Sequence, residues 1–166
     1  MKYAIRPMKP EEYDLLQDFL YEALYVPEGH VPHPRSILST PELRLYYDNF
    51  GSDKDDLALV ACSEDGKVAG CVWTRIMNDY SHLDDETPSL VVSLYDGCRG
   101  QGLGTAMIQA MFDAVRKNGR KAVSLSVQVS HPAQHLYRRL GFVEVGRAMG
   151  ETEEEIVMRY DLAKDR

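Results

Sequence analysis

The chain has 166 residues, of which 44% are hydrophobic and 27% charged, and its formal net charge is −7. These proportions are those of an ordinary globular protein, and the length suits one domain over residues 1–166 with an adequate core. No apolar run reaches the ~20 residues of a membrane span, and residues 1–6 lack the pattern of a signal peptide. We therefore expect a single cytoplasmic domain with no membrane association.

In chain order, residues 2–8 predict a first strand, and Pro10 suits the first turn of a helix that ends before Pro27. The loop that follows, residues 27–40, contains three prolines. It is long for a connection in a compact domain, so we treat it as a candidate functional segment. Thr40 then predicts the N-cap of a second helix, with proline at its first position, that runs to about residue 49.

The second half of the chain reads as further strands and two helices. Residues 57–62 and 68–77 predict a hairpin with its turn at 64–67. An acidic loop over residues 78–88 precedes the remaining elements, which are an apolar strand at 90–95, a helix from 103 to 117, a strand at 122–129, a short helix to 140, and strands at 142–149 and 154–161. The order β-α-α-β-β-β-α-β-α-β-β predicts a mixed α/β fold, whose largely antiparallel sheet has helices on both faces.

The most informative stretch lies between the apolar strand and the long helix. It contains three glycines at alternate positions, in the run Arg99, Gly100, Gln101, Gly102, Leu103, Gly104 and Thr105. Glycines permit unusual backbone dihedrals, and the first amides of a helix have no intrahelical partner and carry the positive end of its dipole. This context favours a cradle for an anion, phosphate above all. A simple tight turn is the alternative, although it needs only one or two glycines.

Charge along the chain is uneven. Residues 97–140 contain seven basic residues and one acidic residue, whereas the rest of the chain has 12 basic and 25 acidic residues. A local basic region in an acidic protein fits one anionic ligand at one place, and it argues against nucleic-acid binding, which needs a broad basic face. The alternative is that Arg116 and Lys117 simply suit the last turn of a helix.

Cysteine and histidine spacing gives no metal site. Cys62, Cys71 and Cys98 are odd in number and far apart, which indicates free thiols in a reducing cytoplasm. His30 and His33 are close in sequence, but no cysteine or carboxylate pattern completes a site around them. We therefore expect no metal.

With these motifs, the element order resembles the GNAT superfamily of N-acetyltransferases over essentially the whole chain. The family's cofactor motif, Arg/Gln-x-x-Gly-x-Gly/Ala, is matched in full by residues 99–104. A second element, Asn-x-x-Ala-x-x-Leu-Tyr-x-x-x-Gly-Phe, is matched by residues 130–142, with Ser130 in place of asparagine. The two motifs lie one strand apart, and together they are specific where each alone is weak.

The resemblance implies direct transfer of an acetyl group from acetyl-CoA to a primary amine, with no metal. The backbone amides of residues 99–105 would hold the pyrophosphate of the cofactor. In the family the strand before the glycine turn splays from the next strand, and the pantetheine arm pairs with its exposed backbone. Here that role falls to Val92 and Leu94, for which simple core positions are the alternative.

Tyr137 is the residue that the resemblance places at the cofactor sulfur. It would be the general acid that protonates the leaving thiolate, or it would only orient the sulfur. The alternative is a tyrosine that packs the short helix. Ser130 would make a shorter polar contact to the cofactor than asparagine does, and its other role would be to cap the helix that begins near Pro132.

The general base is not assigned. Many relatives place a carboxylate on the strand before the glycine turn or on the strand after it, and residues 89–95 and 122–129 have none. The amine proton could leave through water held by Ser93, Ser124 or backbone carbonyls. Glu86 and Glu28 are weaker candidates.

The acceptor is expected to be a small-molecule amine. In the family it is bound by the segment between the first two helices and by the last hairpin, here residues 27–40 and 148–154. Glutamates make these regions acidic, namely Glu28, Glu151, Glu153, Glu154 and Glu155. They favour a cationic amine such as a polyamine, an aminoglycoside-like compound, a lysine or an N-terminal amine, and a solvated acidic turn is the alternative.

Two other classes of function stay open at this stage. One is a regulatory module that binds CoA but has lost catalysis, because neither strand carries a carboxylate. The other is a nucleotide-binding domain, against which the turn lacks the Gly-Lys-Ser/Thr of a P-loop and the spacing of a dinucleotide fingerprint. A homodimer is an expectation of the resemblance only.

Overall fold

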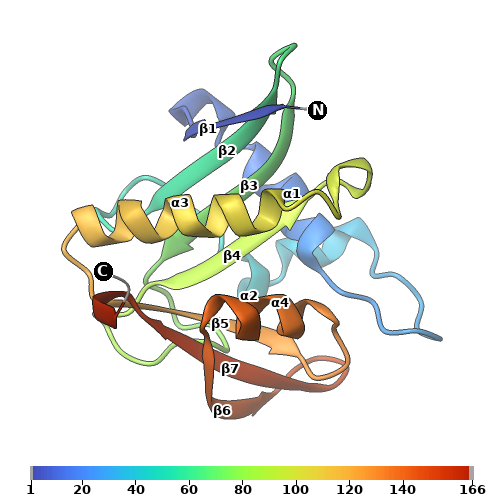
Figure 1. Ribbon diagram of the computed structural model, residues 1–166. Coiled ribbons are helices and arrows are strands. Elements are labelled where there is room, and N and C mark those ends of the chain that lie inside the picture. Colours follow the sequence, from blue (N-terminus) through green and yellow to red (C-terminus); the bar gives the residue numbers. More distant parts are fainter. Residues whose placement is uncertain (1, 165–166) are drawn as a thin grey trace.

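The computed structural model describes residues 2–164, which form a mixed α/β domain around one sheet (Figure 1). Within these residues the sheet has seven strands in the order β1-β2-β3-β4-β5-β7-β6. The strands are β1 (Tyr3–Pro7), β2 (Leu57–Ser63), β3 (Val68–Arg75), β4 (Ser89–Leu94), β5 (Ala122–Gln128), β6 (Val143–Met149) and β7 (Glu154–Asp161). The helices are α1 (Leu15–Ala23), α2 (Pro41–Arg44), α3 (Leu103–Lys117) and α4 (Ala133–Leu140), with short 3₁₀ turns η1 (Pro10–Glu12), η2 (Arg35–Ser39), η3 (Asp96–Cys98) and η4 (Leu162–Lys164). The predicted fold class and element order are confirmed.

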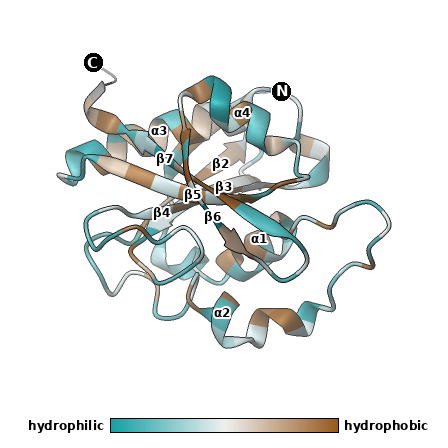
Figure 2. Cartoon of the chain, turned by 90° about the horizontal axis from the view of Figure 1, so that it is seen from below, coloured by the Kyte–Doolittle hydropathy of each residue, from teal (hydrophilic) through white to brown (hydrophobic). Residues whose placement is uncertain are grey.

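Helices cover both faces of the sheet. Figure 2 shows α3 and α4 on one side of the strands and α1 and α2 on the other. The apolar side chains of β5, Val123, Leu125 and Val127, belong to the core cluster under α3. Leu16 and Phe19 of α1 pack with Trp73 of β3 in a second cluster on the opposite face. Alternation along each strand therefore decides which face a residue joins.

The junction of β4 and β5 is the one parallel contact in the described sheet, and it is short. A single residue pair, Ser89 with Ser124, is in register, and the Ser124 amide donates to the carbonyl of Pro88 at 3.0 Å. Beyond this pair no ladder joins the two strands among the described residues. The splay that the resemblance implied is thus present, and the backbone from Leu90 to Leu94 lacks a partner on its β5 side.

The second helix is much shorter than predicted, because side chains of β3 use the carbonyls that a longer helix would need. Trp73 Nε1 donates to the carbonyl of Tyr46 at 3.0 Å, and Arg75 donates to those of Leu45 and Asp48 at 3.0 and 2.7 Å. Thr40 occupies the N-cap position of α2, with Pro41 at the first helical position as predicted, but its side chain makes no capping hydrogen bond. Its hydroxyl donates to the carbonyl of Ile37 at 2.8 Å.

The first predicted helix is also divided, into η1 and α1. The carboxylate of Glu12 accepts hydrogen bonds from the Lys9 amide at 2.8 Å and from the Arg6 guanidinium at 2.8 and 2.9 Å. These contacts tie the first turn to β1. The helix proper therefore begins only at Leu15.

A buried ion pair fixes the far end of α3. Arg120 contacts both oxygens of Asp55, with N–O distances of 2.7 and 2.9 Å, and the Asn118 amide group donates to the same carboxylate at 3.2 Å. Asp55 is 3% exposed. The hydrogen bonds from Arg120 are the main cause that lowers the pKa of Asp55 below its ordinary value.

We expect Asp55→Ala to lower the free energy of unfolding by about 3 kcal/mol, because it leaves the half-buried Arg120 without its partner. Since the folded pKa of Asp55 is depressed, the stabilisation is present at neutral pH and is lost as the pH falls through that pKa. Urea denaturation at pH 7 and pH 3 measures both effects. Asp113→Ala, which removes an exposed pair with Arg116, is the control and should cost less than about 0.5 kcal/mol. Equal losses for the two variants would contradict the assignment.

Candidate functional site

The glycine-rich turn adopts the conformation that its sequence requires. Gly100 and Gly102 have φ of +78° and +76°, in the left-handed region that favours glycine. The backbone amides from Gly100 to Thr105 have no hydrogen-bond partner within residues 2–164. Several donors and the positive end of α3 therefore meet at one place, which is the arrangement that binds phosphate groups.

Arg99 stands beside these amides and is held by the surrounding acids. Its guanidinium lies 2.7 Å from the carboxylate of Asp96 and 3.7 Å from that of Glu22, and its Nε donates to the carbonyl of Leu94 at 3.2 Å. The side chain is half exposed. It therefore supplies a positive charge at the mouth of the turn.

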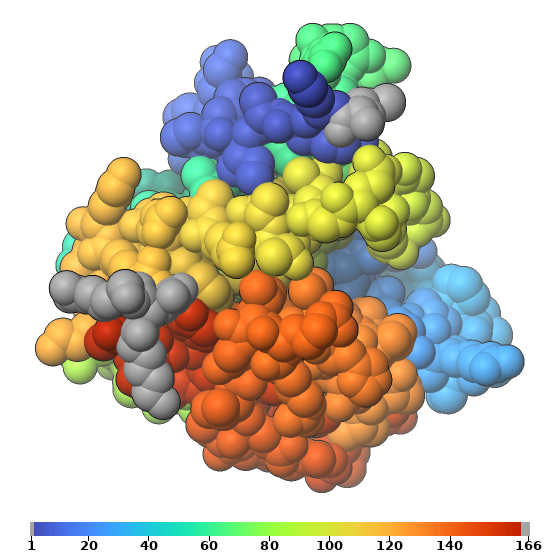
Figure 3. Space-filling view, in the orientation of Figure 1, coloured from blue at the N-terminus to red at the C-terminus, as the bar shows by residue number. Residues whose placement is uncertain are grey.

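Three elements meet at the start of α3. A Cβ built on Gly104 would lie 3.8 Å from Leu94 of β4 and 3.9 Å from Leu136 of α4. Figure 3 shows α3 in yellow and α4 in orange next to each other on this face of the molecule. The exposed end of β4, the free amides and the helix of Tyr137 consequently border one another. Sequence motifs 30 residues apart are thus brought together.

The side chains of Val92 and Leu94 pack against the core under α3, so they have the core role named as an alternative. Their backbone nevertheless lies in the part of β4 that β5 leaves unpaired. The two roles are compatible, because a strand presents its side chains to the faces of the sheet and its amides to the edge.

Tyr137 lies on the inner side of α4. Its ring makes an edge contact with Phe142 at a centroid distance of 5.9 Å and packs against the core cluster. Burial raises the pKa of Tyr137 to about 12. The phenol therefore stays protonated over the working range of most enzymes and is able to donate a hydrogen bond.

Ser130 does not cap α4. Its hydroxyl donates to the carboxylate of Glu153 at 2.5 Å, and the amide of Ala133 donates to Nδ1 of His131 at 3.1 Å. The His131 ring also stacks on Tyr25, with centroids 4.1 Å apart. Burial, and then the charge of Arg99, lower the pKa of His131 to about 4, so Nδ1 can accept that hydrogen bond at neutral pH. Sequence reasoning missed this cap.

The basic residues of positions 97–140 do not form one field. Arg116, in the last turn of α3, donates to the carbonyl of Leu162 and pairs with Asp113. Arg120 follows the end of α3 and pairs with Asp55. Arg138 pairs with Glu144 at 3.5 Å. At the glycine turn itself the basic residue is Arg99. The expectation of a single basic region is wrong, because α3 separates its two ends by about 22 Å.

The opposite face of the sheet carries a cluster of polar groups near the β4–β5 junction. Asp79 accepts hydrogen bonds from the hydroxyls of Tyr46 at 3.0 Å, Ser81 at 2.9 and 3.0 Å, and Ser89 at 2.8 Å. The hydroxyls of Ser93 and Ser124 are buried and have no partner among the described residues. Both serines were named as water-holding candidates.

The weaker base candidates lie in solvent. Glu28 and Glu86 are both exposed. A third glutamate, Glu155 of β7, is half-buried near Asp79, and burial is the main cause that raises its pKa to about 7. In the sequence, Glu155 is one of five glutamates that favour a cationic acceptor, and nothing there assigns it a role of its own because the pairing of β7 with β5 is not visible.

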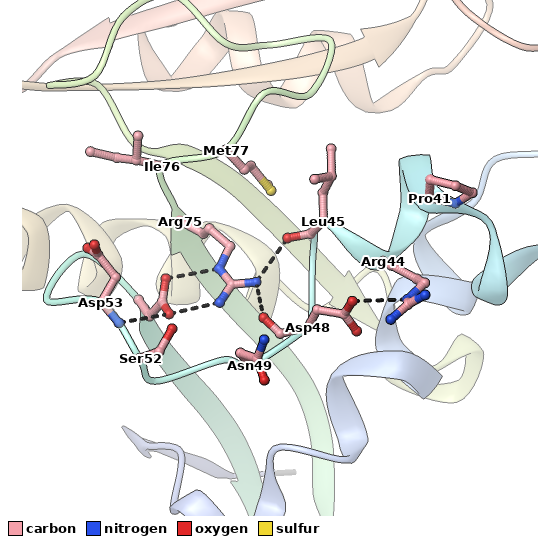
Figure 4. A pocket seen from close by; sticks show the side chains of 11 residues that line it. Pro41, Arg44, Leu45, Asp48, Asn49, Ser52, Asp53, Arg75, Ile76 and Met77 are labelled. Atoms are coloured by element: carbon pink, nitrogen blue, oxygen red, sulfur yellow. Dashed lines mark hydrogen bonds and ion pairs between the residues drawn. The ribbon is translucent and has the colours of Figure 1, made fainter.

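A pocket of about 540 Å³ opens at the other end of β3 (Figure 4). Arg75 lies at its centre and pairs with Asp56 at 2.9 Å, and Arg44 pairs with Asp48 at 2.9 Å. Arg75 is in register with Ser89, whereas Gly70 is in register with Leu94, so about 17 Å of strand separates this pocket from the glycine turn. Because both arginines are paired, we assign the pocket a structural role.

Within residues 2–164 no group of three or more histidine, cysteine or acidic side chains could hold a metal ion. No helix among the same residues is long and apolar enough to cross a membrane. The three cysteines are free thiols, and two of them, Cys62 and Cys71, are buried.

Comparison with known proteins agrees with this geometry. The sequence profile of the Acetyltransferase (GNAT) family matches residues 15–142. Streptothricin acetyltransferase of Streptomyces lavendulae is 32% identical over 97 residues, which are 58% of this chain and 49% of that protein. The chain spans between 35% and 49% of the length of the curated relatives it matches.

Two solved structures illustrate the shared fold. Spermidine/spermine N-acetyltransferase of Vibrio cholerae superposes with a TM-score of 0.68 at 18% identity, over 98% of this chain and 94% of that one. An acetyltransferase of Salmonella typhimurium, described as putative and solved with its cofactor acetyl-CoA, superposes with a TM-score of 0.67 at 18% identity, over 98% and 95%. At these identities the likeness concerns the fold.

We expect Gly102→Ala to destabilise the protein by about 1–2 kcal/mol, because an alanine side chain is strained in the left-handed backbone conformation at φ +76°. No steric clash contributes, since no atom lies within 4 Å of the new Cβ. Gly97→Ala is the control, since Gly97 also has open space but does not have a positive φ. It should change stability by less than about 0.5 kcal/mol. Thermal denaturation measures both, and an unchanged Gly102→Ala would contradict the conformation described.

Proposed function

The chain belongs to the Acetyltransferase (GNAT) family, and from this premise we propose that it transfers an acetyl group from acetyl-CoA directly to a primary amine of a small molecule. The observation that carries the proposal is the set of unpaired amides from Gly100 to Thr105, beside a β4 edge that β5 leaves open. That pairing of a phosphate cradle with a free strand edge suits a long ligand with a diphosphate and an amide-containing arm.

The residues present fit the cofactor. Gly100, Gln101, Gly102, Leu103, Gly104 and Thr105 would hold the diphosphate through their amides, with Arg99 adding charge, and the backbone of Val92 and Leu94 would pair with the arm. When bound, acetyl-CoA supplies an activated thioester. Ser130 is the weakest member of the cofactor set, because its hydroxyl is already used by Glu153.

Tyr137 would act at the sulfur. Its phenol is protonated at neutral pH, since burial raises its pKa to about 12, and it lies on α4 beside the start of α3. A protonated phenol can stabilise a developing thiolate by donating a hydrogen bond or the proton itself.

The acceptor would be a cationic amine. The face of the sheet opposite α4 gathers the carboxylates of Asp79, Glu153 and Glu155, and Tyr80 adds a contact to Glu151 at 3.3 Å. A negative region of this kind attracts an ammonium group. Two similar proteins are named streptothricin acetyltransferase and spermidine/spermine N-acetyltransferase, and the second name is that of an enzyme that acts on polyamines.

A CoA-binding regulatory module is the second candidate, and a specific observation favours it: β4 and β5 carry no carboxylate. Cytoplasmic location rests on the free thiols, and a homodimer rests on family likeness alone. Calorimetry with acetyl-CoA, together with thiol release against a panel of amines, separates the two functions. Binding without release by any amine would favour the module, and absence of binding would overturn both.

We expect Tyr137→Phe to lower kcat by about 10²-fold or more at unchanged affinity for acetyl-CoA, because the phenol acts only as sulfur takes up charge. Tyr13→Phe is the control, since the Tyr13 ring packs edge-on against Phe50, outside the cofactor and acceptor regions. Steady-state thiol release and calorimetry give the two constants. A loss of cofactor affinity equal to the loss of turnover would mean that Tyr137 only packs the helix.

A further inference from the structure

Pairing of β5 with β7 supplies the carboxylate that β4 and β5 lack. Gln128 of β5 is directly opposite Glu155 of β7, and Ser126 is opposite Val157. β5 is the strand that borders the open junction, so Glu155 lies one strand away from that opening and at its wide end. Gln128 and Glu155 are 27 residues apart in sequence, so their contact could not be predicted from the sequence.

Alternation fixes the face on which Glu155 lies. Ile156 and Met158 belong to the core under α3, so Glu155 and Val157 point to the opposite face. Val123, Leu125 and Val127 likewise point to the core, which places Ser124 and Ser126 on the face of Glu155. Ser126 is the neighbour whose hydroxyl lowers the pKa of Glu155, against the effect of burial.

Gly150 leaves the space that the Glu155 side chain occupies. A Cβ at Gly150 would lie 2.9 Å from Oε2 and 3.0 Å from Cγ of Glu155. The hairpin is fixed there by the hydrogen bond from the Gly150 amide to the carbonyl of Glu153 at 3.0 Å. The position of the carboxylate is therefore set by the backbone of the β6–β7 turn.

The neighbouring carboxylates of Asp79 and Glu153 each accept several hydrogen bonds, whereas Glu155 does not accept a comparable number from the described residues around it. Asp79 accepts from three hydroxyls, and Glu153 accepts from Ser130 and from Gln128 at 3.2 Å. Burial, then the charges of Glu153 and Asp79, raise the pKa of Glu155 to about 7, and Ser126 opposes the rise. Tyr46 and Tyr80 also face this carboxylate.

Two buried hydroxyls on the same face point to a ligand at this place. Ser124 is fully buried and lies two residues from Ser126, and Ser93 is 6% exposed on the unpaired part of β4. Neither hydroxyl has a hydrogen-bond partner among the residues described. Buried polar groups are rarely left without one, so these two are suited to a bound polar group or water.

We propose that Glu155 is the general base of the reaction: one oxygen of its carboxylate takes a proton from the ammonium group of the acceptor. The step converts R–NH₃⁺ and a carboxylate into R–NH₂ and a carboxylic acid, so charge and protons balance. The lone pair freed on nitrogen then forms the C–N bond as the C–S bond of the thioester breaks and its electron pair leaves on sulfur. The nitrogen still carries one excess proton, which passes to the thiolate through the Tyr137 phenol or solvent water and leaves a neutral amide and a thiol. This inference rests on the proposed acetyl transfer.

We expect Glu155→Gln to lower kcat/KM by about 10²-fold at pH 7. Wild-type activity should rise with pH through about 7, because the base works in its deprotonated form, and the variant should lack this limb. Its deficit should shrink toward pH 10, where a primary amine loses its proton in solution. Glu64→Gln is the matched control, since Glu64 is exposed in the turn between β2 and β3, outside the cofactor and acceptor regions.

A second readout needs no turnover. In ¹³C-labelled protein without cofactor, a glutamate carboxyl resonance should titrate near pH 7 in wild type and in Glu64→Gln, and be missing in Glu155→Gln. The proposal is overturned if Glu155→Gln keeps the wild-type pH profile, or if it loses activity equally at every pH or along with affinity for acetyl-CoA. Failure of wild type to bind acetyl-CoA would instead overturn the proposed function, and the NMR titration would still report on Glu155.

Discussion

The sheet is interrupted where β4 and β5 meet, because only one residue pair joins these two strands. A sheet is held together by a continuous ladder, and here the ladder stops after Ser89 and Ser124. The two halves of the sheet are kept together instead by what packs on them, chiefly α3 with its core of Met107, Met111 and Phe112. The unpaired backbone is tolerable because it lies at an edge that water or a ligand can reach.

Because β4 and β5 separate, the unpaired edge of β4 lies between two groups of side chains of different chemistry, one on each face of the sheet. On the side of α3 and α4, free amides, Arg99 and the protonated phenol of Tyr137 suit phosphate and sulfur. On the other side, the carboxylates of Asp79 and Glu155 and the two unpartnered serines suit an amine. At this junction the sheet lies between the unpaired amides of the glycine turn and the carboxylates of Asp79 and Glu155, and the gap in its ladder connects the two sides.

Local patterns predicted what local forces determine. The glycine turn, the hairpin turn at 64–67 and the order of helices and strands along the chain follow from residues near one another in sequence, and they are confirmed. The length of α2 could not be predicted, because Trp73 and Arg75 of a later strand take its carbonyls. Glu155 was visible only as one of five acidic residues, since its significance comes from register against β5 and from its burial.

The ring of His131 joins two parts of the chain that the sequence keeps more than 100 residues apart. It caps the first turn of α4 through Nδ1 and stacks on Tyr25, whose hydroxyl reaches the carbonyl of Ser130 at 3.4 Å. The proline-rich segment after α1 is thereby fastened to the helix that carries Tyr137. A displacement of Tyr25 would therefore disturb the first turn of α4, so the start of the proline-rich segment and the helix that carries Tyr137 form one packed unit.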